Sequence, residues 1–278
     1  MSGISAPLGC RLMRRMLPLL LLVALLCVAC STPGHRSAEG RVLFVGNSLI
    51  YVGNTPAVYA ALSASTGRPV ATDMIVRGGA TLHQRLTDGS VARALQDQRY
   101  SVLVLQERGG DLMCSFGRPS CARSRQAVKD LALLARNHGT RVFLLGTYQA
   151  NPQASRELVA MESEAAAVAG IPYIEVSETL QQLRALAPEL NWFAADGMHP
   201  GTDLALLNGL LVHRAVHGAL PAPMALTVQA PIYDSRSGLT ETLRSADAPP
   251  PLSETPLRGH YSQATMARLI RSLDTAKH

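Results

Sequence analysis

Short apolar runs alternate with helix-length amphipathic stretches through most of this chain, and no other feature constrains its fold as strongly. The first run, RVLFVG at 41–46, is almost wholly apolar and ends at glycine, as expected of a strand buried on both faces. Similar runs follow at 69–77, 101–107, 141–148 and 171–176. Helical patterns occupy 56–66, 122–138, 153–169, 177–186 and 202–217. This order predicts an α/β domain, a parallel sheet with helices on both faces.

The alternation covers residues 41–220, which we interpret as one domain. Beyond it the pattern fades, and the segment 246–256 is rich in proline. That composition favours extended chain, so we expect residues 221–278 to form a partly loose C-terminal extension. The pattern from Gly259 onward is that of a short terminal helix.

The first 30 residues have the composition of a signal peptide. Three arginines precede an apolar run of 14 residues, Met16 to Ala29. This run is shorter than the roughly 20 residues of a membrane-spanning helix, but it suits the apolar region of an export signal. No later stretch approaches membrane length, so we expect an exported chain without a spanning helix.

The end of this segment resembles a bacterial lipoprotein signal. Small residues precede Cys30, which such a signal would lipidate, and residues 31–40 would then form a flexible tether. Cys27 departs from that signal, which usually has leucine at this position. We therefore favour a lipid anchor at Cys30 over simple cleavage and release, and we keep both alternatives.

Net charge gives no indication of a nucleic-acid partner. The whole chain carries +6, but the first 30 residues hold three arginines and no acidic residue, so the remainder carries only +3. No cluster of lysine and arginine with interleaved aromatic residues remains in it. We expect neither nucleic-acid binding nor a cofactor.

Cys114 and Cys121 are the two cysteines that lie outside the N-terminal segment. An even pair that closes a short loop containing glycine and proline, in an exported chain, favours a disulfide that staples the loop. A metal site is the alternative, but no CxxC spacing or histidine pair accompanies the cysteines.

The segment VGNSLIY at 45–51 directly follows the first predicted strand. A serine at a tight strand-to-helix turn projects its hydroxyl above the sheet edge, where backbone N–H groups can face a developing oxyanion. Ser48 is therefore a candidate nucleophile. It could equally be a helix N-cap, because serine is favoured there.

A second segment, AADGMHPG at 194–201, lies far downstream. Asp196 and His199 are three residues apart, so a turn can bring both side chains to one side. The carboxylate can then hold one imidazole nitrogen while the other takes a proton from a serine. Taken alone, the same residues could be a helix cap and an exposed turn histidine.

Together, GNSL after the first strand and DGMHP before the last helix resemble the SGNH, or GDSL-like, family of serine hydrolases. The resemblance covers about residues 41–217. It implies a three-layer, flavodoxin-like fold, a catalytic set of Ser48, Asp196 and His199, no metal, and acyl transfer through a serine ester.

The family's two middle blocks give the remaining oxyanion donors. RGGATL at 77–82 follows the second predicted strand, and the resemblance implies that the N–H of Gly79, or of its neighbour Gly78, joins that of Ser48. The family's GxND block is replaced here by VLQERGGD at 104–111. Gln106 is the candidate donor there, as in SGNH-like branches that read LQE, or else a polar residue at a strand end.

A few further polar residues are candidates for the substrate cleft. Asn47 stands where the GDS form has aspartate, and His83 follows the glycine block, although a surface position on a helix fits His83 better. Tyr148 and Asn151 follow the fourth predicted strand, at the edge where parallel sheets hold their sites. His213 and His217 lie four apart, but no third metal ligand is evident, which favours a solvated helix face.

These observations predict an exported serine esterase of the cell envelope. Its expected substrates are small acyl esters, with O-acetylated glycans ahead of lipid esters. Two alternatives remain: a noncatalytic envelope-binding module on the same scaffold, or a lipoprotein that docks a partner through its disulfide loop and proline-rich tail.

Overall fold

A computed structural model describes residue 3 and residues 40–250 and 257–275. The predicted signal peptide, the tether and the lipidation site Cys30 all lie outside the described residues. From Gly40 onward, the described part of the chain belongs to one compact unit. No helix in this part is both long enough and apolar enough to cross a membrane.

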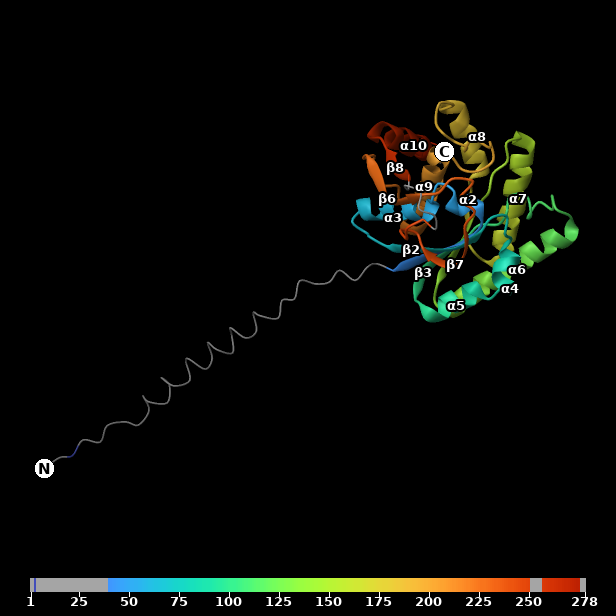
Figure 1. Ribbon diagram of the computed structural model, residues 1–278, viewed down its shortest axis with the longest axis horizontal. Coiled ribbons are helices and arrows are strands. Elements are labelled where there is room, and N and C mark those ends of the chain that lie inside the picture. Colours follow the sequence, from blue (N-terminus) through green and yellow to red (C-terminus); the bar gives the residue numbers. More distant parts are fainter. Residues whose placement is uncertain (1–2, 4–39, 251–256, 276–278) are drawn as a thin grey trace. The chain divides into compact units, whose positions relative to one another are not determined.

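A six-stranded sheet forms the centre of the molecule, with the order β5-β4-β3-β1-β2-β7. Figure 1 shows strands of this sheet, among them β2, β3 and β7, between two groups of helices. Five strands are parallel: β1 (Arg41–Gly46), β2 (Ala71–Arg77), β3 (Tyr100–Leu105), β4 (Arg141–Leu145) and β5 (Tyr173–Ile174). The sixth, β7 (Thr240–Ser245), runs antiparallel beside β2. Because the first residues of β1 and β2 pair in register, the two strands end at the same edge of the sheet.

Helices cover both faces of this sheet, as β1 illustrates. Val42 and Phe44 belong to one buried apolar cluster, and Leu43 and Val45 belong to the other. The first cluster also takes in α3 (Thr55–Ser65), α8 (Ser177–Leu186), α9 (Thr202–His217) and α10 (Gln263–Thr275). The second takes in α4 (Leu82–Thr87), α5 (Ser90–Asp97), α6 (Arg118–Asn137) and α7 (Pro152–Ala169). The predicted three-layer α/β fold is therefore confirmed.

The five strands and five helices predicted from the alternation are all present, with ends shifted by a few residues. The short α4 and α5 were not predicted, because six and eight residues give too little periodicity to recognise. The four-residue α2 (Ser48–Tyr51) was likewise not predicted as a separate helix.

The chain beyond residue 220 is more ordered than its composition predicted. β6 (Leu226–Ile232) and β8 (Leu257–Tyr261) form a two-stranded antiparallel sheet, and the predicted terminal helix is confirmed as α10. The amide of Asn54 donates to the carbonyls of Pro231 and Ala246, at 2.7 and 2.9 Å, and so ties this region to the start of α3. The prediction of a partly loose extension was therefore wrong for residues 226–245, where β6 and β7 lie. Polar residues interrupt both strands, so neither has the continuous apolar run by which the parallel strands were predicted.

Candidate active site

Ser48 stands at the turn from β1 into α2, as predicted. Gly46 ends the strand, and a Cβ there would lie 2.7 Å from the carbonyl oxygen of Gln106, so only glycine allows this close approach. Asn47 is the N-cap of α2, and its side-chain oxygen accepts from Leu49 N at 3.0 Å. Because Asn47 caps the helix, Ser48 is free of that role.

Asp196 and His199 meet Ser48 from the turn that precedes α9. The Oγ of Ser48 lies 2.9 Å from Nε2 of His199, and Nδ1 of the same ring lies 2.8 Å from Oδ2 of Asp196. A continuous hydrogen-bonded chain therefore joins hydroxyl, imidazole and carboxylate, with the geometry required for a proton relay to a serine.

The carboxylate of Asp196 is held in its ionised form. Its Oδ1 accepts the backbone N–H groups of His199 and Met198, each at 2.9 Å. These bonds, together with the side-chain bond to His199, keep the pKa of Asp196 well below its usual range. An ionised partner at Nδ1 leaves Nε2 of His199 as the acceptor for the proton of Ser48.

Tyr148 supports this turn from the end of β4. Its hydroxyl donates to the carbonyl of Met198 at 2.6 Å, and its ring lies 5.7 Å from that of Phe193. Burial raises the pKa of Tyr148, so the hydroxyl remains a proton donor. The tyrosine thus fixes the backbone immediately before His199.

A cavity of about 320 Å³ opens at these residues. Its lining is mainly apolar or uncharged around the serine, with one arginine. The residues are Asn47, Ser48, Leu49, Gly79, Arg108, Gly109, Tyr148, Gln149, Ala150, Phe193, Gly197, Met198 and His199. The structure therefore brings Ser48, His199, Gly79, Asn47 and Tyr148 to one place, as the sequence predicted.

Two backbone N–H groups at this cavity are suited to binding an oxyanion. Gly79 has a φ of 66°, a conformation that favours glycine, and it follows β2 at the same edge as Ser48. Within residues 40–250 and 257–275, no hydrogen bond uses the N–H of Ser48 or of Gly79. Gly78 is not equivalent, because its N–H donates to Leu239 at 3.3 Å and it does not line the cavity.

Gln106 does not reach the cavity, so its predicted role as an oxyanion donor was wrong. The side chain is completely buried, and its Nε2 donates to the carbonyl of Gly146 at 2.9 Å. It therefore reaches sideways to the end of β4 and joins two strand ends. The direction of a side chain after a strand depends on the turn that follows, which the pattern LQE alone does not define.

Of the other candidates for substrate contact, only Tyr148 has a polar group close to the catalytic turn. Asn47 lines the cavity, but its amide is occupied, with Nδ2 donating to the carbonyl of Ala80 at 3.2 Å. His83 lies on α4 and does not line the cavity. Asn151 is the N-cap of α7 and accepts from Gln153 N and Ala154 N, so its predicted contact with substrate was wrong.

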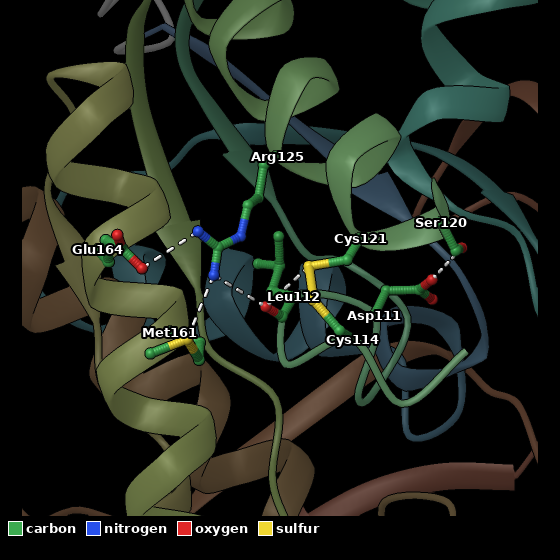
Figure 2. The surroundings of a disulfide bond; sticks show 8 residues. All are labelled: Asp111, Leu112, Cys114, Ser120, Cys121, Arg125, Met161 and Glu164. Atoms are coloured by element: carbon green, nitrogen blue, oxygen red, sulfur yellow. Dashed lines mark hydrogen bonds and ion pairs between the residues drawn. A yellow bond between two sulfur atoms is a disulfide. The ribbon is translucent and has the colours of Figure 1, made fainter. Parts of the chain in front are cut away.

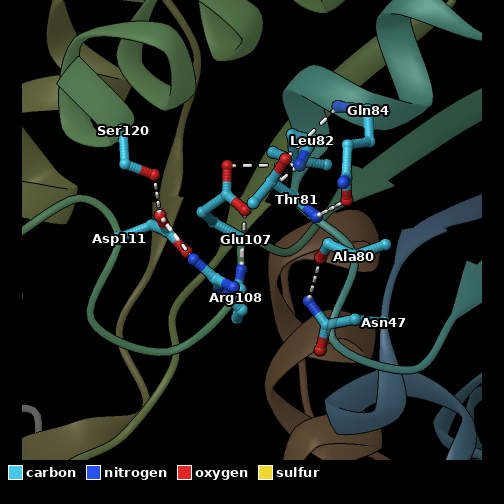
Figure 3. Close-up of polar contacts among 9 residues, drawn as sticks. All are labelled: Asn47, Ala80, Thr81, Leu82, Gln84, Glu107, Arg108, Asp111 and Ser120. Carbon is cyan, nitrogen blue, oxygen red and sulfur yellow. Dashed lines mark hydrogen bonds and ion pairs between the residues drawn. The ribbon is translucent and has the colours of Figure 1, made fainter. Parts of the chain in front are cut away.

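Sequence reasoning missed a polar network behind the cavity wall, shown in Figure 3. Both carboxylate oxygens of Glu107 accept from Leu82 N, at 3.1 and 3.2 Å. Arg108 makes two bonds to the buried carboxylate of Asp111, at 2.6 and 3.1 Å. The sequence did offer one indication of this network, because three charged residues lie within six positions after the end of the apolar strand β3.

The predicted disulfide between Cys114 and Cys121 is present. It closes the loop from β3 to α6, and Ser120 adds a bond to Asp111 at 2.8 Å (Figure 2). Arg125 extends from α6 to bind Glu164 on α7 at 3.1 Å. These links fasten the loop whose first residues, Arg108 and Gly109, line the cavity.

The histidine pair on α9 is packed rather than solvated, contrary to the sequence-based expectation. His213 is buried, and its Nδ1 lies 3.0 Å from the carbonyl of Ala219. His217 stacks on Tyr59, with ring centroids 6.1 Å apart. Among the described residues, no cluster of three or more histidine, cysteine or acidic side chains could hold a metal ion.

Sequence comparison finds no family model and no curated protein that matches this chain. Solved structures do match its fold. A candidate SGNH hydrolase from Slackia heliotrinireducens superposes with a TM-score of 0.53 and 22% identity, covering 64% of this chain and 99% of its own. TesA gives a TM-score of 0.51 and 21% identity, with 64% and 98% covered. The psychrotrophic esterase EstA from Pseudoalteromonas sp. gives a TM-score of 0.50 and 10% identity, and the match covers 65% of this chain and 98% of EstA. At these identities the likeness concerns the fold, and the chain has the fold of SGNH hydrolases.

Proposed function

We propose that this chain is a serine esterase that cleaves small acyl esters by a two-step acyl transfer. The observation that carries the proposal is the unbroken chain from Ser48 through His199 to Asp196, placed at a cavity with two unused backbone N–H groups. The SGNH fold adds support, because each element of this site stands at a strand end or helix start where that fold holds its catalytic groups.

In the first step, Nε2 of His199 takes the proton of Ser48 as Oγ attacks the ester carbonyl. The carbonyl oxygen becomes an oxyanion, and the N–H groups of Ser48 and Gly79 stabilise it. His199 then gives its proton to the leaving alcohol, and the acyl group stays on Ser48. In the second step, water loses a proton to His199 and attacks the acyl-enzyme; the bond to Oγ of Ser48 then breaks, His199 returns the proton to this oxygen, and the acid leaves.

Asp196 stays ionised through both steps of the reaction. It holds the proton on Nδ1 of His199, which leaves Nε2 free to accept, and it stabilises the imidazolium that forms. The two N–H groups that bind its other oxygen keep the carboxylate oriented while the charge on the ring changes.

The size of the cavity supports a short acyl group. Its volume of about 320 Å³ lies at the small end of the range for ligand pockets. Leu49, Phe193 and Met198 provide apolar surface beside the serine. We propose acetyl esters as the first class to examine, with O-acetylated glycans as the natural form suited to an envelope location.

The test compares the parent with Ser48→Ala, using residues 31–278 purified under oxidising conditions and p-nitrophenyl acetate as substrate. We expect turnover to fall by a factor of about 10⁴ or more, because the nucleophile itself is lost. Ser65→Ala, at the exposed end of α3, is a matched control and should retain parental activity. Circular dichroism checks that both variants fold.

A folded parent that hydrolyses neither p-nitrophenyl acetate nor an acetylated glycan would contradict the proposal. Failure of Ser48 to react with a fluorophosphonate would then favour a noncatalytic binding module on this fold.

We also propose that the protein is exported and anchored in the cell envelope through a lipid on Cys30. The apolar segment before Cys30 supports export, and a disulfide of this kind is typical of oxidising compartments. Labelling cells with a radioactive fatty acid should mark the parent but not Cys30→Ala. Equal labelling of both proteins, or of neither, would reject the anchor.

A further inference from the structure

Glu107 is a buried carboxylate that the proposed mechanism leaves unused. Its side chain is 1% exposed, and it directly follows Gln106 at the end of β3. Arg108, the adjacent cation, binds Asp111 instead (Figure 3), and no arginine or lysine in the described part of the chain forms an ion pair with Glu107. Burying a carboxylate without a cationic partner costs stability, so the contacts that Glu107 does make need to be examined.

The contacts of Glu107 reach the segment that carries Gly79. Both carboxylate oxygens accept from Leu82 N, at 3.1 and 3.2 Å, and Oε1 also accepts from Arg108 N at 2.8 Å. One carboxylate thus joins two loops of the cavity wall, because Gly79 lies just before Leu82 and Gly109 just after Arg108.

The same segment is held a second time, from the side of the nucleophile. Nδ2 of Asn47, the residue before Ser48, donates to the carbonyl of Ala80 at 3.2 Å (Figure 3). Ala80 N in turn donates to Arg77 at 3.0 Å, which closes a tight turn around Gly79. Between Arg77 and Leu82, the backbone is therefore fixed on both sides of the N–H that the mechanism uses.

We propose that Glu107 is a positioning residue for the oxyanion site, holding the Gly79–Leu82 segment so that the Gly79 N–H stands where negative charge develops. This inference rests on the proposed esterase function. Catalytic stabilisation of an oxyanion needs donors that are already in place, so a small displacement of Gly79 weakens the transition state more than it weakens substrate binding.

A carboxylate suits this position better than an amide does. Leu82 N and Arg108 N are both donors, and a carboxylate presents two acceptor oxygens to them. Glutamine would offer one oxygen and would turn an NH₂ group toward a donor. Burial raises the pKa of Glu107 to about 7, while the bonds from Arg108 and Leu82 act in the opposite direction.

The experiment measures kcat and KM for p-nitrophenyl acetate on the parent, Glu107→Gln and Glu107→Ala. We expect kcat to fall roughly 10- to 100-fold in Glu107→Gln, somewhat less than complete loss of an oxyanion donor causes, with KM changed less than about twofold. In Glu107→Ala the decrease in kcat should be larger, because no side-chain acceptor remains for Leu82 N and Arg108 N. If Glu107→Ala does not fold, Asn47→Ala tests the second tie to the same segment and should also lower kcat rather than raise KM.

Asp73→Asn is the matched control. Asp73 is also a buried carboxylate, but it lies toward the start of β2, where it binds Arg41 and Tyr100. The Asp73→Asn substitution should lower the melting temperature while leaving kcat within about twofold of the parent. A folded Glu107→Gln with parental kcat would overturn the inference, and so would an equal loss of kcat in Asp73→Asn. If the parent itself shows no hydrolysis that depends on Ser48, the proposed function fails, and this inference fails with it.

Discussion

The two halves of the active site are built in opposite ways. On the nucleophile side, Asn47 and Glu107 are each 1% exposed, and their hydrogen bonds lie behind the cavity wall. On the histidine side, Asp196 and Gly197 lie at the surface and Met198 is 66% exposed. The serine and its oxyanion donors thus lie within two residues of strand ends of the sheet, whereas the acid–base pair belongs to a surface turn.

This difference follows from what each half must do. Oxyanion donors act through fixed geometry, and buried strand ends provide it. A proton relay needs an imidazole that can accept from one atom and donate to another, and a surface turn tolerates such small movements. The turn keeps its shape through a few bonds, among them Ala194 N to the carbonyl of His199 at 2.9 Å and Tyr148 to Met198.

The largest effect that would sharpen this comparison is expected for Asp196→Asn. The substitution removes the charge that orients His199 but leaves the nucleophile half intact, so kcat should fall by about 10³–10⁴ while the oxyanion site remains formed. Steady-state kinetics with p-nitrophenyl acetate measures the loss, and Asp97→Asn, at the exposed end of α5, is the control. A loss below tenfold would mean that the surface turn does not set the state of the histidine.

The next largest effect is expected in the pH dependence of stability, because the carboxylates of the two halves have pKa values shifted in opposite directions. Burial raises to about 7 the pKa of Glu107 and that of Glu162, a buried residue of α7 that accepts from Thr147 N after the end of β4. Between about pH 4.5 and pH 7 each is therefore protonated in the folded chain but ionised in the unfolded one, and above pH 7 both are carboxylates in the folded chain as well. Their contribution is complete below about pH 4 and disappears as pH rises through 7, roughly 3 kcal/mol for each. Asp196 behaves oppositely, because its lowered pKa adds stability that is lost only in stronger acid.

Urea unfolding between pH 4 and pH 8 measures this dependence. The free energy of unfolding should decrease toward pH 8 in the parent, and the decrease should be smaller in Glu107→Gln. Identical slopes in the parent and in Glu107→Gln would show that this carboxylate does not titrate in that range.

The smallest effect is expected for Tyr148→Phe. This change removes only the bond from the hydroxyl to Met198 at 2.6 Å, and one such bond contributes about 1 kcal/mol. We expect a three- to tenfold decrease in kcat and faster amide hydrogen exchange in the turn at 194–199. Tyr100→Phe, which removes a hydroxyl bound to Asp73 away from the cavity, is the control. No change in either measurement would mean that the turn is held without Tyr148.

The same contrast explains which parts of the site the sequence predicted. Ser48, Asp196 and His199 belong to short motifs whose geometry is local, so the residues themselves indicate it. Glu107 and Gln106 act through contacts with Leu82 and Gly146, which are distant in sequence, and their directions depend on the turn after β3. Asn151 became a helix cap for a local reason, since asparagine before proline at a helix start is favoured there.

For the fold, long apolar runs made the parallel strands predictable. The strands beyond residue 220 are no shorter, but they lack a continuous apolar run, and β7, at the edge of the sheet, has only exposed and half-buried residues. The register of such a strand is determined by its partner rather than by its own composition.

The pairing of β7 with β2 affects when the protein can become active. Leu239, just before β7, accepts from Gly78 N, so the last part of the sheet touches the residue beside the oxyanion glycine. With export as proposed, the chain is delivered N-terminus first, so β2 arrives long before β7 and stays an open edge until the C-terminal region has followed. Hydrolytic competence is thus expected as one of the last events in the maturation of the polypeptide, after the chain has been delivered past Ser245.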